Sequence, residues 1–592
     1  MSQPAKSGKH PRGLYVLFAT EMWERFNYYG MRAILIYFMT QALLFKLDFA
    51  SNLYGSYISL LYLTPLVGGY VADRFWGNKR SILVGGIVMA IGEILLFICA
   101  SIYNTSPDIS GYLFFSGLGL MIAGNGFFKP NISSLVGQLY PKGDLRVDPA
   151  YTIFYMGINI GAWLGPIICG TVGNTGNPAD FKWAFLVSGI GMVISVIIQK
   201  IYHNKYVLSP EGTVLGLTPG QEAKTIDPLT GEEHRNVKPP PKIAYNVLTI
   251  VVGMVVFSAL MIGALYLDTR VNYLFYLLIA SFIFIIAVIF SDKNLSPNEK
   301  QRIWVMVIIA FFVVFFWGAY EQTGASLSIF ADQQTNLNLW GTYHMPPSYF
   351  QSFNSAFIII FAPLFAWMWL KMGKSQPSSP FKMGIGLLLL ALGYLWIAYG
   401  VKDVGLSSKV SIIWLTGLYL LHTWGELCLS PIGLSLFNKL APLRFASLLM
   451  AVWFLGNAGG NKLAGTLSAL YPQPLIAASA VDSIKTSSNI SIFNTDSKAF
   501  EYKGTMVYSL DGIDYSSIKK DSVYNGVDGA RLQEDIALQV RKATFSSETN
   551  FLGYRMNDLY DFFMLFVFMS GFAGIVLLVL SKRLKKMMHG IQ

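Results

Sequence analysis

Fourteen apolar segments of about 18 residues or more constrain this 592-residue chain more than any other feature. A helix needs about 20 apolar residues to cross the hydrocarbon core of a bilayer. Only 13% of the residues are charged, whereas a soluble protein carries about 25%. We therefore expect an all-α polytopic membrane protein with fourteen transmembrane helices. The expected spans are residues 14–44, 53–73, 81–102, 111–138, 150–173, 183–202, 244–267, 272–291, 301–332, 348–370, 383–401, 410–438, 444–471 and 556–581.

Basic residues in the short loops orient these spans. Lys and Arg concentrate in the cytoplasmic loops of membrane proteins, and here they gather on one set of alternating loops. These residues are Arg74, Lys79, Arg80, Lys142, Arg146, Lys371, Lys374, Lys382, Lys439, Arg444, Lys582, Arg583, Lys585 and Lys586. The pattern predicts that both termini are cytoplasmic. It also explains the net charge of +11 without nucleic-acid binding.

The first span carries ionisable and aromatic side chains along one helical face. The residues on this face are Glu21, Glu24, Arg25, Tyr28, Tyr29 and Arg32. Their spacing keeps all six on one side of a helix. A charge at the centre of a bilayer costs roughly 2.5–3.5 kcal/mol on insertion scales. We therefore expect this face to line a polar cavity and not to contact lipid.

The segment from Gly68 to Arg80, between the second and third spans, resembles the loop signature of the major facilitator superfamily. In that superfamily two six-helix bundles rock about a central site. The resemblance implies a major facilitator fold with a two-helix insertion. It divides the chain into an N-terminal bundle (1–202), a cytoplasmic linker (203–243), a two-helix connector (244–298), five helices of the second bundle (299–472), a periplasmic insertion (473–555) and a last helix with a cytoplasmic tail (556–592).

A more specific motif occupies residues 21–30 and resembles E-x-x-E-R-F-x-Y-Y-G of the proton-dependent oligopeptide transporter family. Further segments resemble that family's fourth-, fifth-, seventh- and tenth-helix signatures, namely residues 128–131, 154–161, 317–322 and 426–435. The extra spans 244–267 and 272–291 are similar to the helix pair of bacterial members. The resemblance implies a proton-coupled symporter that imports di- and tripeptides across the inner membrane by alternating access.

A free peptide is zwitterionic, so its site needs a cation for the carboxylate and an anion or amide for the ammonium. Arg25 and Lys129 are the candidates for the carboxylate, and Glu426 is the candidate for the ammonium. The same family positions supply amides and aromatic walls, here Asn159, Asn354, Tyr28, Tyr29, Tyr62, Trp317 and Trp453, and the tenth-helix signature adds Ser430.

Proton coupling needs a titratable group whose ion-pair partner changes with conformation. The candidates are Glu21, Glu24 and Glu321, with Arg25, Arg32 and Lys129 as their partners. The resemblance implies two gating pairs, Arg32–Glu321 on one side of the cavity and Lys129–Glu426 on the other. We hypothesise that the peptide carboxylate competes for Arg25 or Lys129 and so frees a glutamate to take a proton.

Less specific interpretations stay open for these residues. Glu21 lies four residues before Arg25, the favourable spacing for a pair within one helix. Lys129 and Glu321 can snorkel toward helix ends, the two asparagines can hydrogen-bond helices together, and aromatic residues are common at membrane interfaces. Glu93, in the third span, faces either the cavity or another helix.

Transport of nitrate or another small solute is an alternative function, and so is a peptide sensor that does not transport. A nitrate carrier does not need Glu426, which therefore favours peptides. We expect no enzyme, because the chain has no nucleophile–base constellation, and Cys99, Cys169 and Cys428 lack metal-like spacing. We expect no metal, no cofactor other than the coupling proton, no nucleic acid and no obligate protein partner. Gly55 stands where animal members carry a histidine implicated in proton handling.

Overall fold

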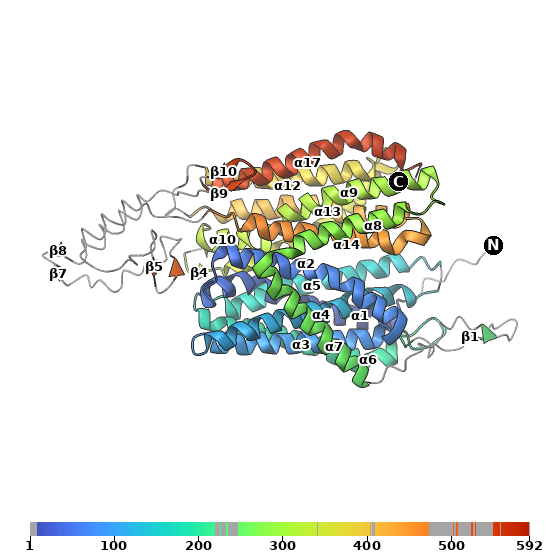
Figure 1. Ribbon diagram of the computed structural model, residues 1–592, viewed down its shortest axis with the longest axis horizontal. Helices are drawn as coiled ribbons and strands as arrows, with labels where there is room; N and C mark the ends of the chain where they lie inside the picture. Colours follow the sequence, from blue (N-terminus) through green and yellow to red (C-terminus); the bar gives the residue numbers. More distant parts are fainter. Residues whose placement is uncertain are drawn as a thin grey trace.

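The computed structural model describes residues 9–141, 143–218, 247–339, 341–402, 404, 409–472, 549–556 and 558–590, together with six short strands between residues 225 and 528. Long helices with roughly parallel axes form the body of the molecule (Figure 1). Of the predicted linker 203–243, residues 203–218 and the short strands Thr225–Ile226 and Glu233–His234 are described, and the predicted insertion 473–555 lies largely outside the described residues.

Fourteen long helices occur in the described part of the chain, which confirms the expected fold class. They are α1 (Arg12–Tyr37), α2 (Leu47–Val71), α3 (Asn78–Ile102), α4 (Pro107–Gln138), α5 (Val147–Gly173), α6 (Phe181–Tyr206), α7 (Val247–Val271), α8 (Tyr273–Phe290), α9 (Pro297–Tyr320), α11 (Phe350–Met372), α12 (Ser379–Val401), α13 (Ile412–Leu440), α14 (Ala446–Ser468) and α17 (Leu559–Met587). A short helix, α10 (Ser326–Gln333), follows α9.

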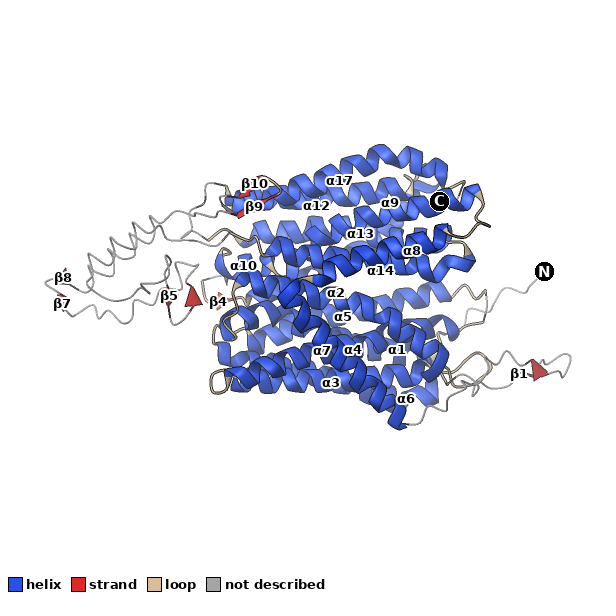
Figure 2. Ribbon diagram, viewed as in Figure 1, coloured by secondary structure: helices blue, strands red, loops and turns tan. Residues whose placement is uncertain are grey.

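The strands are short and form two-stranded antiparallel pairs outside the helical body (Figure 2). They are β1 (Thr225–Ile226) with β2 (Glu233–His234), β3 (Asn338–Leu339) with β4 (Tyr343–His344), β5 (Glu501–Tyr502) with β6 (Thr505–Met506), β7 (Val523–Tyr524) with β8 (Val527–Asp528), and β9 (Thr549–Phe551) with β10 (Tyr554–Met556).

Two bundles and a hairpin make up the helical body. Helices α1–α6 pack together as the first bundle, and α9, α11–α14 and α17 pack together as the second. The bundles meet along α2 with α14 and along α5 with α11. The hairpin α7–α8, green in Figure 1, touches both bundles, because α7 packs against α2 and α4 while α8 packs against α14.

Helix α1 begins and helix α17 ends at the same end of the bundle (Figure 1). We call this end the terminus side and the opposite end the far side. Helix α2 therefore runs from the far side to the terminus side, whereas α7 and α14 run toward the far side.

Eleven of the described helices are long and apolar enough to cross a membrane, judged by length and composition. The other three long helices, α1, α2 and α14, are more polar. Helix α1 carries Glu21 and Arg25, and α14 carries Lys462, all of them buried within the protein. Ionisable groups inside a membrane protein face the bundle interior and pair with one another. The three more polar helices therefore indicate that the functional part of the molecule lies in its interior, beside α1, α2 and α14.

The predicted span 301–332 is not one continuous helix. Helix α9 ends at Tyr320, a 3₁₀ turn covers Glu321–Gly324, and α10 follows. A Cβ at Gly324 would lie 1.6 Å from the hydroxyl of Tyr54, so only glycine permits this approach between the bundles. The break places Glu321 at the bundle interface, where it meets the first helix.

Candidate functional site

A central cavity of about 330 Å³ lies between the two bundles. Eleven predicted site residues line it: Tyr29, Arg32, Tyr62, Lys129, Asn159, Trp317, Glu321, Asn354, Glu426, Ser430 and Trp453. They come from α1, α2, α4 and α5 of the first bundle and from α9, the following turn, α11, α13 and α14 of the second. The predicted polar chamber shared by both halves of the chain is therefore present.

Glu426 is held at the second-bundle wall of the cavity. Its Oε2 accepts a hydrogen bond from the hydroxyl of Tyr320 at 2.5 Å and another from Nδ2 of Asn354 at 2.9 Å. Asn354 also donates to Thr423 at 3.1 Å. Tyr320 was not predicted, although it directly precedes Glu321 within the seventh-helix signature. Neutral donors therefore orient the Glu426 carboxylate and leave its charge available for a cationic ligand.

Lys129 lies on the opposite wall, on α4. Its Nζ sits 4.7 Å from the centroid of the Tyr62 ring, a distance at which an ammonium is attracted by the face of an aromatic ring. Asn159, also on the first-bundle wall, donates a hydrogen bond from Nδ2 to the backbone carbonyl of Tyr155 at 2.9 Å. The cavity therefore has a cationic wall in the first bundle and an anionic wall in the second.

The predicted gating pair Lys129–Glu426 is not formed in this conformation, and it stays a prediction for the conformation in which the terminus side is closed. The reason is geometric. Lys129 and Glu426 occupy opposite walls of an open cavity, with Tyr320 and Asn354 satisfying the carboxylate instead.

The other predicted contact, between Arg32 and Glu321, is formed. The Arg32 guanidinium hydrogen-bonds the Glu321 carboxylate, and both side chains are buried. Nε of Arg32 also donates to the hydroxyl of Tyr54 at 2.5 Å. The pair ties α1 of the first bundle to the turn after α9 in the second.

Arg25, Tyr28, Glu21 and Glu24 are not among the residues that line the central cavity. Nε of Arg25 lies 2.8 Å from Glu21 Oε1 and 2.7 Å from Glu24 Oε2, and Tyr28 packs under the guanidinium at 5.7 Å. Two carboxylates thus hold Arg25 against its own helix. The pairing within one helix, left open from the sequence, is the arrangement found for Glu21.

Glu93, whose surroundings the sequence left open, faces another helix. Its Oε1 accepts from Nδ2 of Asn27 at 2.7 Å, and Asn27 donates to the backbone carbonyl of Ser188 at 3.1 Å. This contact joins α1, α3 and α6 inside the first bundle, away from the central cavity.

The far side is closed by contacts between the bundles. The hydroxyl of Tyr37 donates to the carbonyl of Ser328 at 2.8 Å, and Gln41 donates to Asp332 at 3.0 Å. Ser51 and Ser468 lie 3.1 Å apart on α2 and α14. With Arg32–Glu321 beneath them, these contacts seal the central cavity from the far side.

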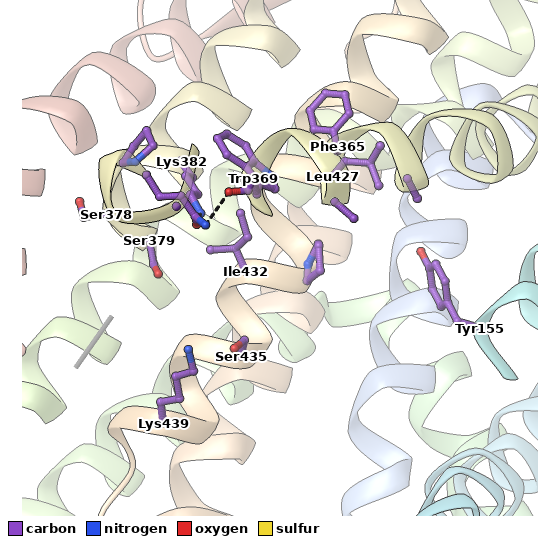
Figure 3. A pocket seen from close by; sticks show the side chains of 16 residues that line it. Tyr155, Phe365, Trp369, Ser378, Ser379, Lys382, Leu427, Ile432, Ser435 and Lys439 are labelled. Carbon is purple, nitrogen blue, oxygen red and sulfur yellow. Dashed lines mark hydrogen bonds between the residues drawn. The ribbon is translucent and has the colours of Figure 1, made fainter. Parts of the chain in front are cut away.

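Toward the terminus side the interior is open. A second cavity of about 550 Å³ runs between α5, α11, α12 and α13, and Tyr155 lines both it and the central cavity. Figure 3 shows Lys382, Trp369, Ser435 and Lys439 around this space. Nζ of Lys382 donates to Gln376 at 2.8 Å and lies over the Trp369 ring. The two cavities therefore adjoin at Tyr155, and Lys382 and Lys439 line the one nearer the terminus side.

Comparison with known proteins gives consistent matches. A sequence model of the family described as "PTR2: POT family" matches residues 79–207 and 237–484, more than half of the chain. The chain is 36% identical to "Uncharacterized transporter YclF" of Bacillus subtilis, over 78% of this chain and 88% of that protein. It is 32% identical to a "Di-/tripeptide transporter" of Lactococcus lactis subsp. cremoris, over 78% and 90%.

The fold resembles a solved structure as well. A crystal structure of "peptide transporter POT in complex with sulfate" superposes with a TM-score of 0.70 at 28% identity, covering 100% of this chain and 98% of that one. The family match, the relatives and this structure agree with the first-helix motif. The chain belongs to the POT family, the proton-dependent oligopeptide transporters.

Proposed function

We propose that this protein is a proton-coupled symporter that imports di- and tripeptides by alternating access. One observation carries the proposal: a cavity between two bundles presents Lys129 on one wall and Glu426 on the other. A short peptide with free termini has the complementary pair of charges. The name of the Lactococcus relative, a di-/tripeptide transporter, supports the same substrate class.

The ammonium of the peptide would bind at Glu426. Asn354 and Tyr320 already hold this carboxylate in place. Ligand binding therefore costs little conformational entropy of the Glu426 side chain. The carboxylate of the peptide would bind at Lys129, whose ammonium rests on Tyr62. The cavity volume of about 330 Å³ lies at the small end of the range for ligand pockets, which favours short peptides.

The aromatic residues Tyr29, Trp317 and Trp453 also line the cavity. Their broad apolar surfaces hold side chains of different shape without a specific hydrogen bond to each. This arrangement supports recognition of the peptide termini and tolerance of the side chains.

Glu321 is the proposed proton acceptor on the far side. In the closed far side its carboxylate is buried against Arg32, and a proton on Glu321 would remove the charge that Arg32 neutralises. The far side could then open, because a protonated carboxyl no longer forms the ion pair. A peptide carboxylate bound at Lys129 would link substrate binding to the protonation of Glu321 on the far side within one transport cycle.

The terminus side is the proposed cytoplasmic side of the inner membrane. Lys382 and Lys439 lie at its mouth, and such residues concentrate on cytoplasmic loops. The present conformation is then open to the cytoplasm and closed to the outside.

Uptake by reconstituted protein tests this proposal. Liposomes with an imposed inward proton gradient are given labelled dialanine, with labelled nitrate and free alanine as controls. We expect dialanine to accumulate above its external concentration only when the gradient is present. Gradient-driven uptake of nitrate in place of dialanine would contradict the proposal.

A further inference from the structure

A buried ion pair lies outside the central cavity, between the hairpin α7–α8 and the second bundle. Nζ of Lys462 on α14 sits 2.5 Å from Oδ2 of Asp268 on α7. The two side chains are only 2% and 1% exposed. Removing one partner of such a pair leaves an uncompensated buried charge, which is strongly unfavourable. Neither residue belongs to the segments that resemble the family's signatures.

Ser56 on α2 joins the first bundle to this pair. Its hydroxyl donates to Oδ2 of Asp268 at 2.6 Å and accepts from Lys462 at 2.8 Å. The other oxygen of Asp268 accepts from the backbone N–H of Leu274 at 2.8 Å, in the first turn of α8. One carboxylate therefore contacts the hairpin turn, the first bundle and the second bundle. We call Ser56, Asp268 and Lys462 the hairpin triad.

Asp268 is attached to the first bundle through α7. A Cβ at Gly119 of α4 would lie 2.3 Å from a side-chain carbon of Ile262 on α7, so the two helices are in close contact. Buried apolar side chains of α7 also share one cluster with side chains of α3 and α4. Lys462, in contrast, belongs to α14 of the second bundle.

The hairpin triad lies beside a close approach of the backbones of the two bundles on the far side. A Cβ at Gly55 of α2 would lie 2.7 Å from Cα of Gly465 on α14 and 2.9 Å from the carbonyl oxygen of Asn461. The backbones of α2 and α14 therefore touch here. Any opening of the far side has to part these helices, and with them Lys462 from its partners on α2 and α7.

We propose that the hairpin triad is a second far-side latch of the transport cycle, in which Asp268 and Lys462 act as positioning residues. The inference rests on the proposed function, because only alternating access requires the far side to open. With the triad assembled, the far side is closed. Parting the bundles separates two buried charges, so the triad favours the conformation that is open at the terminus side. The hairpin thereby supplies the acidic half of a latch from outside both bundles.

The test is double electron–electron resonance on the full-length protein in liposomes. Spin labels at the exposed far-side positions Asn104 and Lys402 report the separation of the bundles. We expect Lys462→Met to raise the ratio of open to closed far side by about tenfold or more. Asp268→Asn should act in the same direction. The double variant should shift the ratio by less than the product of the two single effects, because it leaves no charge unpaired.

A second label pair, at Lys205 and Lys371 on the terminus side, distinguishes a latch from a merely structural contact. A latch predicts that the terminus side narrows as the far side widens. Loosening of the hairpin alone would broaden the distances without this reciprocal change, and that result would overturn the proposal. So would multiplicative effects of Lys462→Met and Asp268→Asn in the double variant.

Arg270→Gln is the matched control. Arg270 is exposed, lies two residues after Asp268 on α7 and hydrogen-bonds Tyr266, so its loss should change the ratio by less than about twofold. If the triad variants change the open-to-closed ratio no more than Arg270→Gln does, the latch is contradicted.

Ser56→Ala removes only the bridging hydroxyl and carries the test if Lys462→Met does not fold. It should raise the open-to-closed ratio by about threefold, and an unchanged ratio would contradict the latch.

Dialanine uptake by the unmutated protein is measured separately. Failure of that uptake together with the expected label shifts would refute the substrate and leave the latch standing.

Discussion

Gly55→Ala should open the far side by steric means alone. The new methyl carbon would lie 2.7 Å from Cα and 3.0 Å from the backbone nitrogen of Gly465, whereas ordinary contacts begin near 3.4 Å. Backbone atoms cannot rotate away, so α2 and α14 have to separate by about 0.7 Å. Overpacking of this kind costs about 1–3 kcal/mol. Because the clash exists only while the far side is closed, the cost shifts the conformational equilibrium about 5- to 150-fold toward far-side opening.

Electron–electron resonance with labels at Asn104 and Lys402 measures this shift. Gly69→Ala is the matched control on the same helix, because its methyl carbon would meet only the side chain of Pro130, at 3.7 Å. We expect a longer far-side distance for Gly55→Ala and an unchanged distribution for Gly69→Ala. An unchanged distribution for Gly55→Ala would refute the assignment of this contact to the closed far side.

Three further variants test the site, and a pair of variants at Glu93 tests the packing of the first bundle. Lys129→Ala should abolish gradient-driven dialanine accumulation while exchange without a gradient persists, and wild-type accumulation would disprove its coupling role. Glu426→Gln should weaken the binding of peptides with a free amino terminus by about tenfold, ~1.4 kcal/mol, and the binding of N-acetylated peptides much less. Equal losses of affinity for both peptides in competition assays would show that Glu426 does not bind the ammonium. Glu321→Gln should widen the far side at neutral pH and make the label distance independent of pH, so a retained pH dependence would point to another proton acceptor. Glu93→Leu leaves one of the two N–H groups of the buried Asn27 amide without an acceptor and should destabilise the protein by about 1–3 kcal/mol. Glu93→Gln keeps an acceptor oxygen and should not; melting curves in detergent compare the two variants.

Helical periodicity predicted the parts of the site that one helix determines. The spacing from Glu21 to Arg32 predicts that the four charged residues of this stretch face the interior, and all four are buried. The same spacing places Glu21 within reach of Arg25, and the pair forms. The fold class followed equally from segment length, because a bilayer admits few structures other than apolar helices.

Contacts between distant segments could not be derived from periodicity. Lys462 is a lone charge in an apolar run, whereas Asp268 directly follows the predicted span 244–267 and lies two residues before Arg270. The two residues are 194 residues apart, and nothing local in either segment indicates the other. The partner of Glu426 was missed for a related reason. Tyr320 lies on α9, 106 residues before Glu426 on α13, and the pattern of neither segment indicates their contact.

The central claim is that the peptide lies across the cavity with its ammonium at Glu426 and its carboxylate at Lys129. The most direct test is an experimental structure of the protein with bound dialanine. We predict the peptide nitrogen within hydrogen-bond distance of the Glu426 carboxylate and the peptide carboxylate beside Lys129. A peptide bound in the opposite orientation, or outside this cavity, would contradict the account.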